Sequence, residues 1–230
     1  MGRALPRQPR KPFDLKSRAG RLWVYLHYLW YDHAYLRIGF QNAHWISEEM
    51  LRTNQPWPFQ LKWWKQKGIK TVICLRGGLL GSFYALEKDA CETLGLNFET
   101  FIVTSRDVPP RELVLAARDL FERVEYPALL HCKSGADRAG IMSVFYAHYR
   151  LGQPISIARN QLSWRYLHAK AGKTGMLDHV FEMYLQEAEP KGISFTEWVE
   201  SPAYDQDRIR ASFKAQWWGS WLTETLLRRE

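Results

Sequence analysis

Cysteine is scarce in this chain: among 230 residues only Cys74, Cys91 and Cys132 occur. Three scattered cysteines exclude a disulfide framework, and no group of histidine, cysteine and aspartate has metal-ligand spacing. We therefore expect no structural disulfide, no metal and no cofactor. Free thiols are typical of the reducing cytoplasm, where a cysteine stays available as a nucleophile.

The N-terminal part lacks a hydrophobic run long enough to cross a membrane. The segment 22–31 has ten residues that are apolar or aromatic except for one histidine, whereas a spanning helix needs about 20. It also lacks the small-residue cleavage site of a signal peptide. We therefore expect a cytoplasmic protein, with association at a membrane surface as an open alternative.

Negative charge is scarce in residues 1–21, where seven arginines and lysines accompany the single Asp14. Three prolines disfavour a regular helix there, so we expect a disordered basic tail. Three interpretations of 1–31 stay open. The aromatic segment packs on the core beside a solvated tail, or both parts dock on an anionic membrane surface, or the tail contacts nucleic acid. The last is not expected, because no nucleic-acid motif is present.

One decapeptide, HCKSGADRAG at 131–140, carries most of the functional information. The apolar run 127–130 before it is typical of a short buried strand, and 141–149 after it favours a helix. A strand, a glycine-containing loop and a helix N-terminus direct backbone N–H groups and the positive end of the helix dipole towards one point. The pattern therefore predicts an oxyanion site.

Cys132 and Arg138 make this loop reactive as well as anion-binding. The N–H groups and the helix dipole favour the thiolate of Cys132, and the planar guanidinium of Arg138 matches two oxygens of a phosphate. Together they predict attack of sulfur on phosphorus, with Arg138 stabilising the equatorial oxygens. The alternative is a chance Cys-x5-Arg spacing around a buried cysteine that acts only as a small apolar residue.

Residues 131–140 resemble the signature loop of the cysteine-dependent protein tyrosine and dual-specificity phosphatases. The segments 42–46, 50–56 and 68–77 resemble the opening of compact bacterial and atypical members. The resemblance covers about 40–185 and implies a phosphatase whose substrate is a phosphorylated protein or a phosphoinositide. It also implies that the substrate phosphate is bound by Lys133, Ser134, Gly135, Ala136, Asp137 and Ala139, beside the catalytic Cys132 and Arg138.

Ala139 departs from the pattern of the family. Most members have serine or threonine directly after the arginine, and its hydroxyl helps the thiolate leave when the intermediate is hydrolysed. Alanine at this position leaves two alternatives open, a slow enzyme or a pseudophosphatase that binds phosphate without turnover. A sulfurtransferase of the rhodanese type is a third alternative, which the strand order and the Asp107 loop argue against.

Two aspartates are candidates for the acid that protonates the leaving group. Asp107 precedes Val108 and two prolines in a loop that resembles the acid loop of tensin-type lipid phosphatases, and it is the one we favour. Asp137 is the rival, because its place resembles that in the loop of phosphoinositide-cleaving myotubularins. Lys133 suggests a substrate with more than one phosphate, as in the tensin type, although a solvated lysine without a partner explains it equally well.

The order of the elements predicts an α/β fold. We expect a central, mostly parallel sheet of four to five strands flanked by helices, with helical extensions at both ends and Cys132 at the carboxyl end of a strand. Cys74, at the end of the strand 71–75, is favoured as a buried structural thiol over a redox partner of Cys132. The expected organisation is a tail at 1–21, an aromatic helical segment at 22–36, a phosphatase domain at 37–190 and a helical extension at 191–230.

Overall fold

The computed structural model describes residues 13–170 and 172–214. Most of the predicted basic tail and the last part of the C-terminal extension, including Trp217, Trp218 and Trp221, lie outside the described residues. The chain forms two compact units. The first unit contains the described residues up to 102 and residues 124–135. The second unit contains residues 103–123 and the described residues from 136 onward. The predicted domain boundaries stay a prediction.

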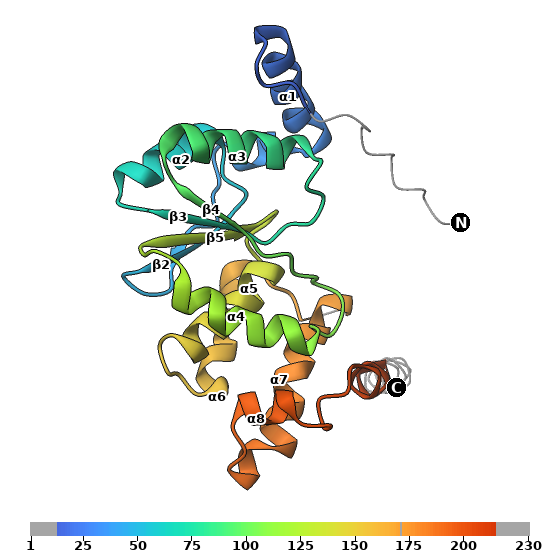
Figure 1. The fold of residues 1–230 in the computed structure, drawn as a ribbon. Helices are drawn as coiled ribbons and strands as arrows, with labels where there is room; N and C mark the ends of the chain where they lie inside the picture. Colours follow the sequence, from blue (N-terminus) through green and yellow to red (C-terminus); the bar gives the residue numbers. More distant parts are fainter. Residues whose placement is uncertain (1–12, 171, 215–230) are drawn as a thin grey trace, which may run out of the picture. The chain divides into compact units, whose positions relative to one another are not determined.

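A five-stranded sheet forms the centre of the first unit (Figure 1). The strand order is β1-β2-β5-β3-β4, and only the edge pair β1–β2 is antiparallel. This confirms the predicted α/β fold with a mostly parallel sheet. The strands are β1 (His44–Trp45), β2 (Met50–Asn54), β3 (Thr71–Cys74), β4 (Asn97–Thr100) and β5 (Ala128–Cys132).

The central strand β5 anchors the core of this unit. Leu129 pairs in register with Leu51 on one side and Val72 on the other. These three side chains pack with apolar residues of α2 (Pro58–Gln66) and α3 (Ser82–Leu94), which lie together on one face of the sheet in Figure 1. A strand buried on both faces reads as a continuous apolar run, which is why the sequence revealed β5.

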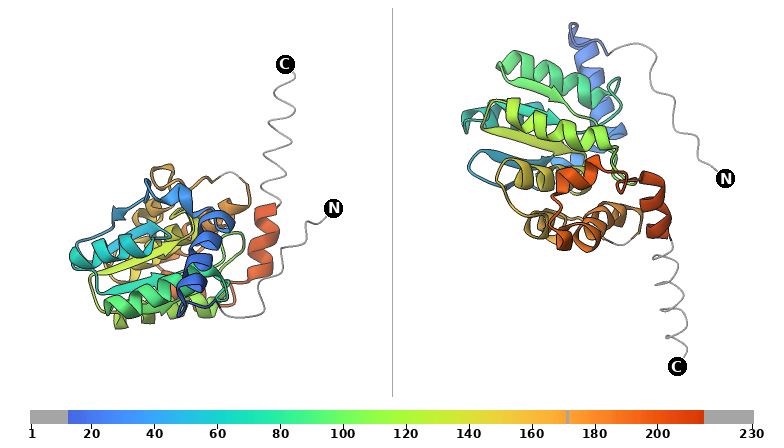
Figure 2. Two further views of the ribbon diagram at one scale, coloured as in Figure 1. Left: turned by 90° about the horizontal axis from the view of Figure 1, so that it is seen from above. Right: turned by 60° about the horizontal axis from the view of Figure 1, so that its bottom comes forward.

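Helix α1 (Arg18–Tyr31) packs beside α3, as both views of Figure 2 show. The Ser17 side chain caps it by accepting a hydrogen bond from the N–H of Gly20 at 3.0 Å. Residues 18–21, which were predicted to belong to the tail, are therefore helical, because the N-cap fixes the start of the helix. Val24 and Tyr28 are buried against Trp57 and Phe83.

The second unit is helical in the part that the structure describes. It contains α4 (Arg111–Arg123), α5 (Asp137–Tyr149), α6 (Ile155–Ala158), α7 (Met176–Glu187) and α8 (Phe195–Glu200), followed by a helical segment at 206–214. The rings of Phe145, Phe181 and Phe195 meet in its core.

Residues 156–166 do not form one continuous helix. After α6 the chain forms two short 3-10 turns, separated by Ser163 in an extended conformation. The stretch contains Asn160 and Ser163, residue types whose side chains compete with the helix for backbone hydrogen bonds. Leu162 leaves the helical region and becomes buried.

Replacing Leu129 by alanine should lower the free energy of unfolding by about 2–5 kcal/mol, because it opens a cavity in a fully buried layer. Chemical denaturation measures this loss. Leu80→Ala is the matched control, since that side chain is 54% exposed and should change stability by about 0.5 kcal/mol or less. Equal effects of the two variants would contradict the assignment of the core.

Candidate active site

The signature loop begins at the carboxyl end of the central strand. Cys132 is the last residue of β5, opposite Asn54 of β2, and it is 1% exposed. Helix α5 then starts at Asp137. The predicted succession of strand, loop and helix is therefore confirmed, and the chain crosses from the first unit to the second between Gly135 and Ala136.

Gly135 is required by the shape of the loop. Its φ of 76° lies in the left-handed region, and a Cβ there would approach the Asn42 side chain, the backbone of Thr53 and the N of Asn54 to 2.9 Å. A larger residue would meet both a steric clash and an unfavourable backbone conformation. Glycine is thus the residue that lets the loop turn close against β2.

Two polar side chains of the first unit hold this turn. Asn42 donates a hydrogen bond from Nδ2 to the carbonyl of Ser134 at 3.0 Å, and the fully buried Arg52 donates from Nη2 to the carbonyl of Gly135 at 2.9 Å. Since the C=O and N–H of a trans peptide point in opposite directions, the N–H groups of these two peptides point away from Asn42 and Arg52. This orientation suits an anion-binding nest.

Lys133 has an acidic partner, although its side chain is 41% exposed. Its Nζ lies 3.4 Å from Oδ1 of Asp32. The same carboxylate contacts Arg76 through Oδ1 at 2.6 Å and Arg37 through Oδ2 at 2.5 Å. Burial opposes ionisation of Asp32, but the hydrogen bond and charge of Arg76, with Arg37 and Lys133, outweigh it and lower the pKa of Asp32. The lysine charge at the loop is therefore partly neutralised.

The side chain of His131 contacts a buried glutamate of α3. Its Nε2 lies 2.6 Å from Oε1 of Glu87, and neither side chain is more than 1% exposed. The Cys74 thiol completes a cluster whose three ligand atoms lie within 4.8 Å, which sequence spacing did not indicate. Two ligands of a tetrahedral zinc are about 3.3 Å apart, given bonds of about 2.0 Å. The 2.6 Å between Nε2 of His131 and Oε1 of Glu87 is shorter than this separation. It is the distance of a direct contact between the two side chains.

Cys74 is a buried free thiol, as favoured from the sequence. Burial and the nearby Glu87 raise its pKa, so the reactive thiolate is suppressed. Cys74 pairs in register with His131 and lies beside its side chain. Because side chains alternate along a strand, Cys132 projects to the opposite face. This arrangement argues against a disulfide between Cys74 and Cys132.

In the second unit, Asp137 is bound by a histidine that the sequence analysis missed. His168 contacts Oδ1 of Asp137 through Nδ1 at 2.7 Å and Oδ2 of Asp178 through Nε2 at 2.8 Å. Its side chain is 1% exposed. Burial lowers its pKa, but hydrogen bonds to the two carboxylates outweigh this and raise it to about 9. His168 is therefore an imidazolium at neutral pH and donates from both nitrogens.

Arg138 and Ala139 follow Asp137 in the first turn of α5. Arg138 is half-buried, whereas Ala139 is fully buried. The carbonyl of Ala139 accepts a hydrogen bond from the Ser143 hydroxyl at 2.6 Å. Ser134 is exposed on the loop.

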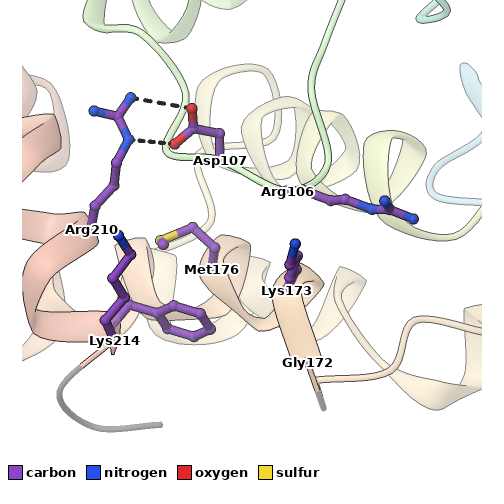
Figure 3. Close-up of a pocket in the computed structure, with 8 residues that line it drawn as sticks. Arg106, Asp107, Gly172, Lys173, Met176, Arg210 and Lys214 are labelled. Carbon is purple, nitrogen blue, oxygen red and sulfur yellow. Dashed lines mark hydrogen bonds and ion pairs between the residues drawn. The ribbon is translucent and has the colours of Figure 1, made fainter. Parts of the chain in front are cut away.

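Asp107 is held by an arginine from the C-terminal extension (Figure 3). Arg210 contacts Oδ1 through Nε at 2.6 Å and Oδ2 through Nη2 at 3.2 Å, and Oδ1 also accepts a hydrogen bond from the N–H of Val108. The hydrogen bond from Arg210 lowers the pKa of Asp107. The carboxyl therefore favours its ionised form and must gain a proton before it can act as the predicted acid.

Comparison with known protein families decides the class of the protein. A family model described as a DSP-PTPase phosphatase fused to NAD+ kinase matches residues 42–178, more than half of the chain. The chain belongs to this phosphatase family. No curated protein matches it in sequence.

Two solved structures show the same fold as this phosphatase. TpbA of P. aeruginosa in complex with pTyr has a TM-score of 0.50 at 17% identity, over 68% of this chain and 90% of that one. The core catalytic domain of the PP-IP phosphatase SIW14 of S. cerevisiae, in complex with citrate, has a TM-score of 0.51 at 17% identity, over 66% and 90%. The predicted membership of the cysteine-dependent phosphatases is thus confirmed, and the sulfurtransferase alternative is not supported.

The structure of the phosphatase places the predicted site residues in two groups. Residues 132–135 lie in the first unit with their supports Asp32, Asn42 and Arg52, and residues 136–139 lie in the second unit with His168. Asp107 also lies in the second unit. No short-range motif marks the supports, because each is distant from the loop in the sequence. The catalytic and binding roles of the predicted site residues remain predictions.

Replacing His168 by glutamine should remove a pH-dependent part of the stability. The pKa of His168 is about 9 in the folded protein and 6.5 as a reference. Its stabilisation is therefore complete below pH 6.5 and is lost as the pH rises through 9, by up to about 3 kcal/mol. Denaturation at a series of pH values measures this slope. Asp178→Asn should move this loss of stability to lower pH, because it removes one of the two carboxylates that raise the pKa of His168. If the stability of His168→Gln depended on pH as that of the wild type does, the ion pairs would be contradicted.

Proposed function

We propose that the chain hydrolyses phosphate monoesters through a cysteinyl-phosphate intermediate. The observation that carries this is the position of Cys132, buried at the end of β5 and followed by a loop whose carbonyls are held by Asn42 and Arg52. Such a loop presents its N–H groups to a phosphate, and α5 adds the positive end of its dipole. Family membership supports the same chemistry.

In the first step the thiolate of Cys132 attacks phosphorus while the bond from phosphorus to the leaving oxygen breaks. Arg138 and the loop N–H groups stabilise the equatorial oxygens in the transition state. The leaving oxygen takes a proton from a carboxylic acid, which becomes a carboxylate. We assign this role to Asp107, because its side chain is 48% exposed and lines a cavity, whereas Asp137 is bound to the buried His168.

In the second step water attacks phosphorus and the thiolate of Cys132 leaves. The carboxylate formed in the first step accepts a proton from that water. Ala139 supplies no hydroxyl to assist the departing thiolate, so we propose that this step limits the rate. A burst of leaving group followed by slow turnover is the kinetic consequence.

We propose a phosphorylated protein as the substrate. The related fold of TpbA was determined with pTyr bound, and the comparisons do not favour a phosphoinositide. The partial neutralisation of Lys133 by Asp32 also weakens the argument for a lipid headgroup that rested on a free ammonium group.

Cys132→Ser should abolish phosphate release from a phosphotyrosine peptide by several orders of magnitude, because the hydroxyl is a far weaker nucleophile than the thiolate. The variant should still bind vanadate, since the loop is unchanged. Phosphate release assayed with malachite green provides the measurement. Release that persists in the variant would remove Cys132 from the mechanism, and vanadate binding without any wild-type release would identify a pseudophosphatase.

A second proposal concerns the surface of the protein and an anionic membrane. Within the described residues no helix is long and apolar enough to span a bilayer. Helix α1 nevertheless exposes Leu22, Trp23, Leu26 and Trp30 to between 42% and 65%. Exposed tryptophan and leucine on a helix that is preceded by a basic sequence favour docking at an anionic interface. We keep the prediction of a cytoplasmic enzyme and propose that it binds to an anionic membrane surface through α1.

Replacing Trp23 and Trp30 together by alanine should weaken binding to phosphatidylserine vesicles about tenfold or more, because the aromatic side chains enter the interface. Vesicle sedimentation measures the bound fraction, which should also fall as salt is added. Trp164→Ala is the matched control, since Trp164 is 75% exposed in the second unit. An equal loss in the control, or no binding by the wild type, would contradict membrane docking.

A further inference from the structure

A buried histidine joins the starts of two helices in the second unit. His168 contacts Oδ1 of Asp137, the first residue of α5, at 2.7 Å. It also contacts Oδ2 of Asp178, in the first turn of α7, at 2.8 Å. The steps proposed above give this histidine no role, although one of its two partners belongs to the signature loop. Because each ring nitrogen has a carboxylate partner, His168 holds the Asp137 side chain in one orientation.

The backbone directly before His168 is strained. Leu167 has φ 64° and ψ 17°, in the left-handed region. Its N–H bonds to the carbonyl of Trp164 at 2.9 Å, and the N–H of His168 bonds to the carbonyl of Ser163 at 3.1 Å. These two bonds form a Schellman turn, in which glycine is the usual residue at the position of Leu167. Strain of this kind persists where surrounding contacts hold the chain, and the contacts of His168 with two carboxylates are of that kind.

The start of α5 has free groups that suit an anion. Among the described residues, no side chain caps this helix at Ala136. None of the described residues forms an ion pair or a hydrogen bond with the guanidinium of Arg138. Free N–H groups and an unpaired guanidinium are the groups that bind a phosphate. The carboxylate of Asp137 lies between them in the sequence.

That carboxylate is a competitor for both kinds of group. A carboxylate in the first turn of a helix is attracted to the free N–H groups and to the positive end of the dipole. An aspartate also pairs with an arginine directly beside it on a helix of this unit, since Arg118 Nε lies 3.4 Å from Oδ1 of Asp119 on α4. Either contact by Asp137 would occupy groups that the phosphate needs and would bring two anions together.

We propose that His168 is a positioning residue for phosphate binding, which holds the carboxylate of Asp137 away from Arg138 and from the N–H groups of α5. The inference rests on the proposed function, in which Arg138 binds the transferring phosphate. His168 supplies a positive charge as well as a hydrogen bond, because it is an imidazolium at neutral pH. Asp178 binds the other ring nitrogen, so the ring stays directed at Asp137.

The charge of His168 depends on its surroundings in a way that an experiment can use. Burial lowers its pKa, but the hydrogen bonds and charges of Asp137 and Asp178 outweigh this and raise it to about 9. The other charged residues near this group are Arg159, Lys170 and Glu182, which line a pocket with Asp178, and Lys170 pairs with Glu182. A rise in pH through 9 removes the imidazolium charge and should free Asp137.

The test measures binding of tungstate, which has the shape of phosphate and stays a dianion over the pH range used. Calorimetry is done on the Cys132→Ser protein, so that no nucleophilic thiol titrates. At about pH 7, the further change His168→Gln should weaken tungstate binding about tenfold. His148→Gln is the matched control, because His148 lies in the last turn of α5 and contacts the carbonyl of Gln153 at 2.8 Å. It should retain the affinity of the parent protein.

Asp137→Asn distinguishes positioning from a purely structural role. Asparagine has no charge and competes weakly for a guanidinium. When Asp137→Asn is already present, His168→Gln should therefore change the tungstate affinity less than about twofold. If His168 only stabilised the fold, loss of both partners would weaken binding further. Thermal melting checks the folding of each variant. Should His168→Gln be unstable, Asp178→Asn keeps His168 and Asp137 in place and should move the loss of affinity to lower pH.

The pH profile is a second readout. With Asp137 present, tungstate affinity should fall as the pH rises through about 9, and with Asp137→Asn this fall should be absent. Weaker binding by His168→Gln would support the role even if no substrate is turned over.

Turnover of an aryl phosphate by the protein with Cys132 separates two kinds of failure. A wild type that turns over, together with equal tungstate affinities with and without His168→Gln, would overturn the positioning role alone. No turnover and no tungstate binding would overturn the proposed function and this role with it.

Discussion

The hydrogen bonds that Asn42 and Arg52 donate to the carbonyls of Ser134 and Gly135 are the contacts on which the active-site loop depends. They turn the N–H groups of the two peptides that follow Ser134 and Gly135 away from Asn42 and Arg52. The close approach of the loop to β2 leaves room only for glycine at position 135. The parallel pairing of β2 with β5 brings Arg52 next to β5. A hydrogen bond from the N–H of Asn54 to the carbonyl of Gln41 holds the segment that carries Asn42 against β2. The sheet topology thus determines the shape of the site that surrounds Cys132.

The charged residues predicted for the site each belong to a small ion cluster. Asp32 binds Lys133 together with Arg37 and Arg76. His168 binds Asp137 and Asp178, and Arg210 binds Asp107 and Asp207. Asp32 and His168 are buried, so these two clusters hold residues of the signature loop in place, whereas the cluster around Asp107 is half-exposed.

Local patterns predicted the fold better than they predicted the surroundings of the site. The sequence predicted the strand β5, the glycine-containing loop and the start of α5, because each of these depends on residues that are neighbours in the chain. The supports Asn42, Arg52 and His168 were missed, since tertiary contacts bring them to the loop from 31 to 92 residues away. Arg210, the partner of Asp107, was missed for the same reason, because it lies 103 residues further along the chain.

The central claim is that phosphate passes through the sulfur of Cys132. Rapid acid quenching after mixing with an aryl phosphate, followed by mass spectrometry of the proteolysed protein, tests it directly. The account predicts that the peptide containing Cys132 gains one phosphoryl group within the first turnover, and that this species accumulates because Ala139 gives the thiolate no help in leaving. Phosphate release without a phosphorylated Cys132 peptide, or with the phosphoryl group on another residue, would contradict it.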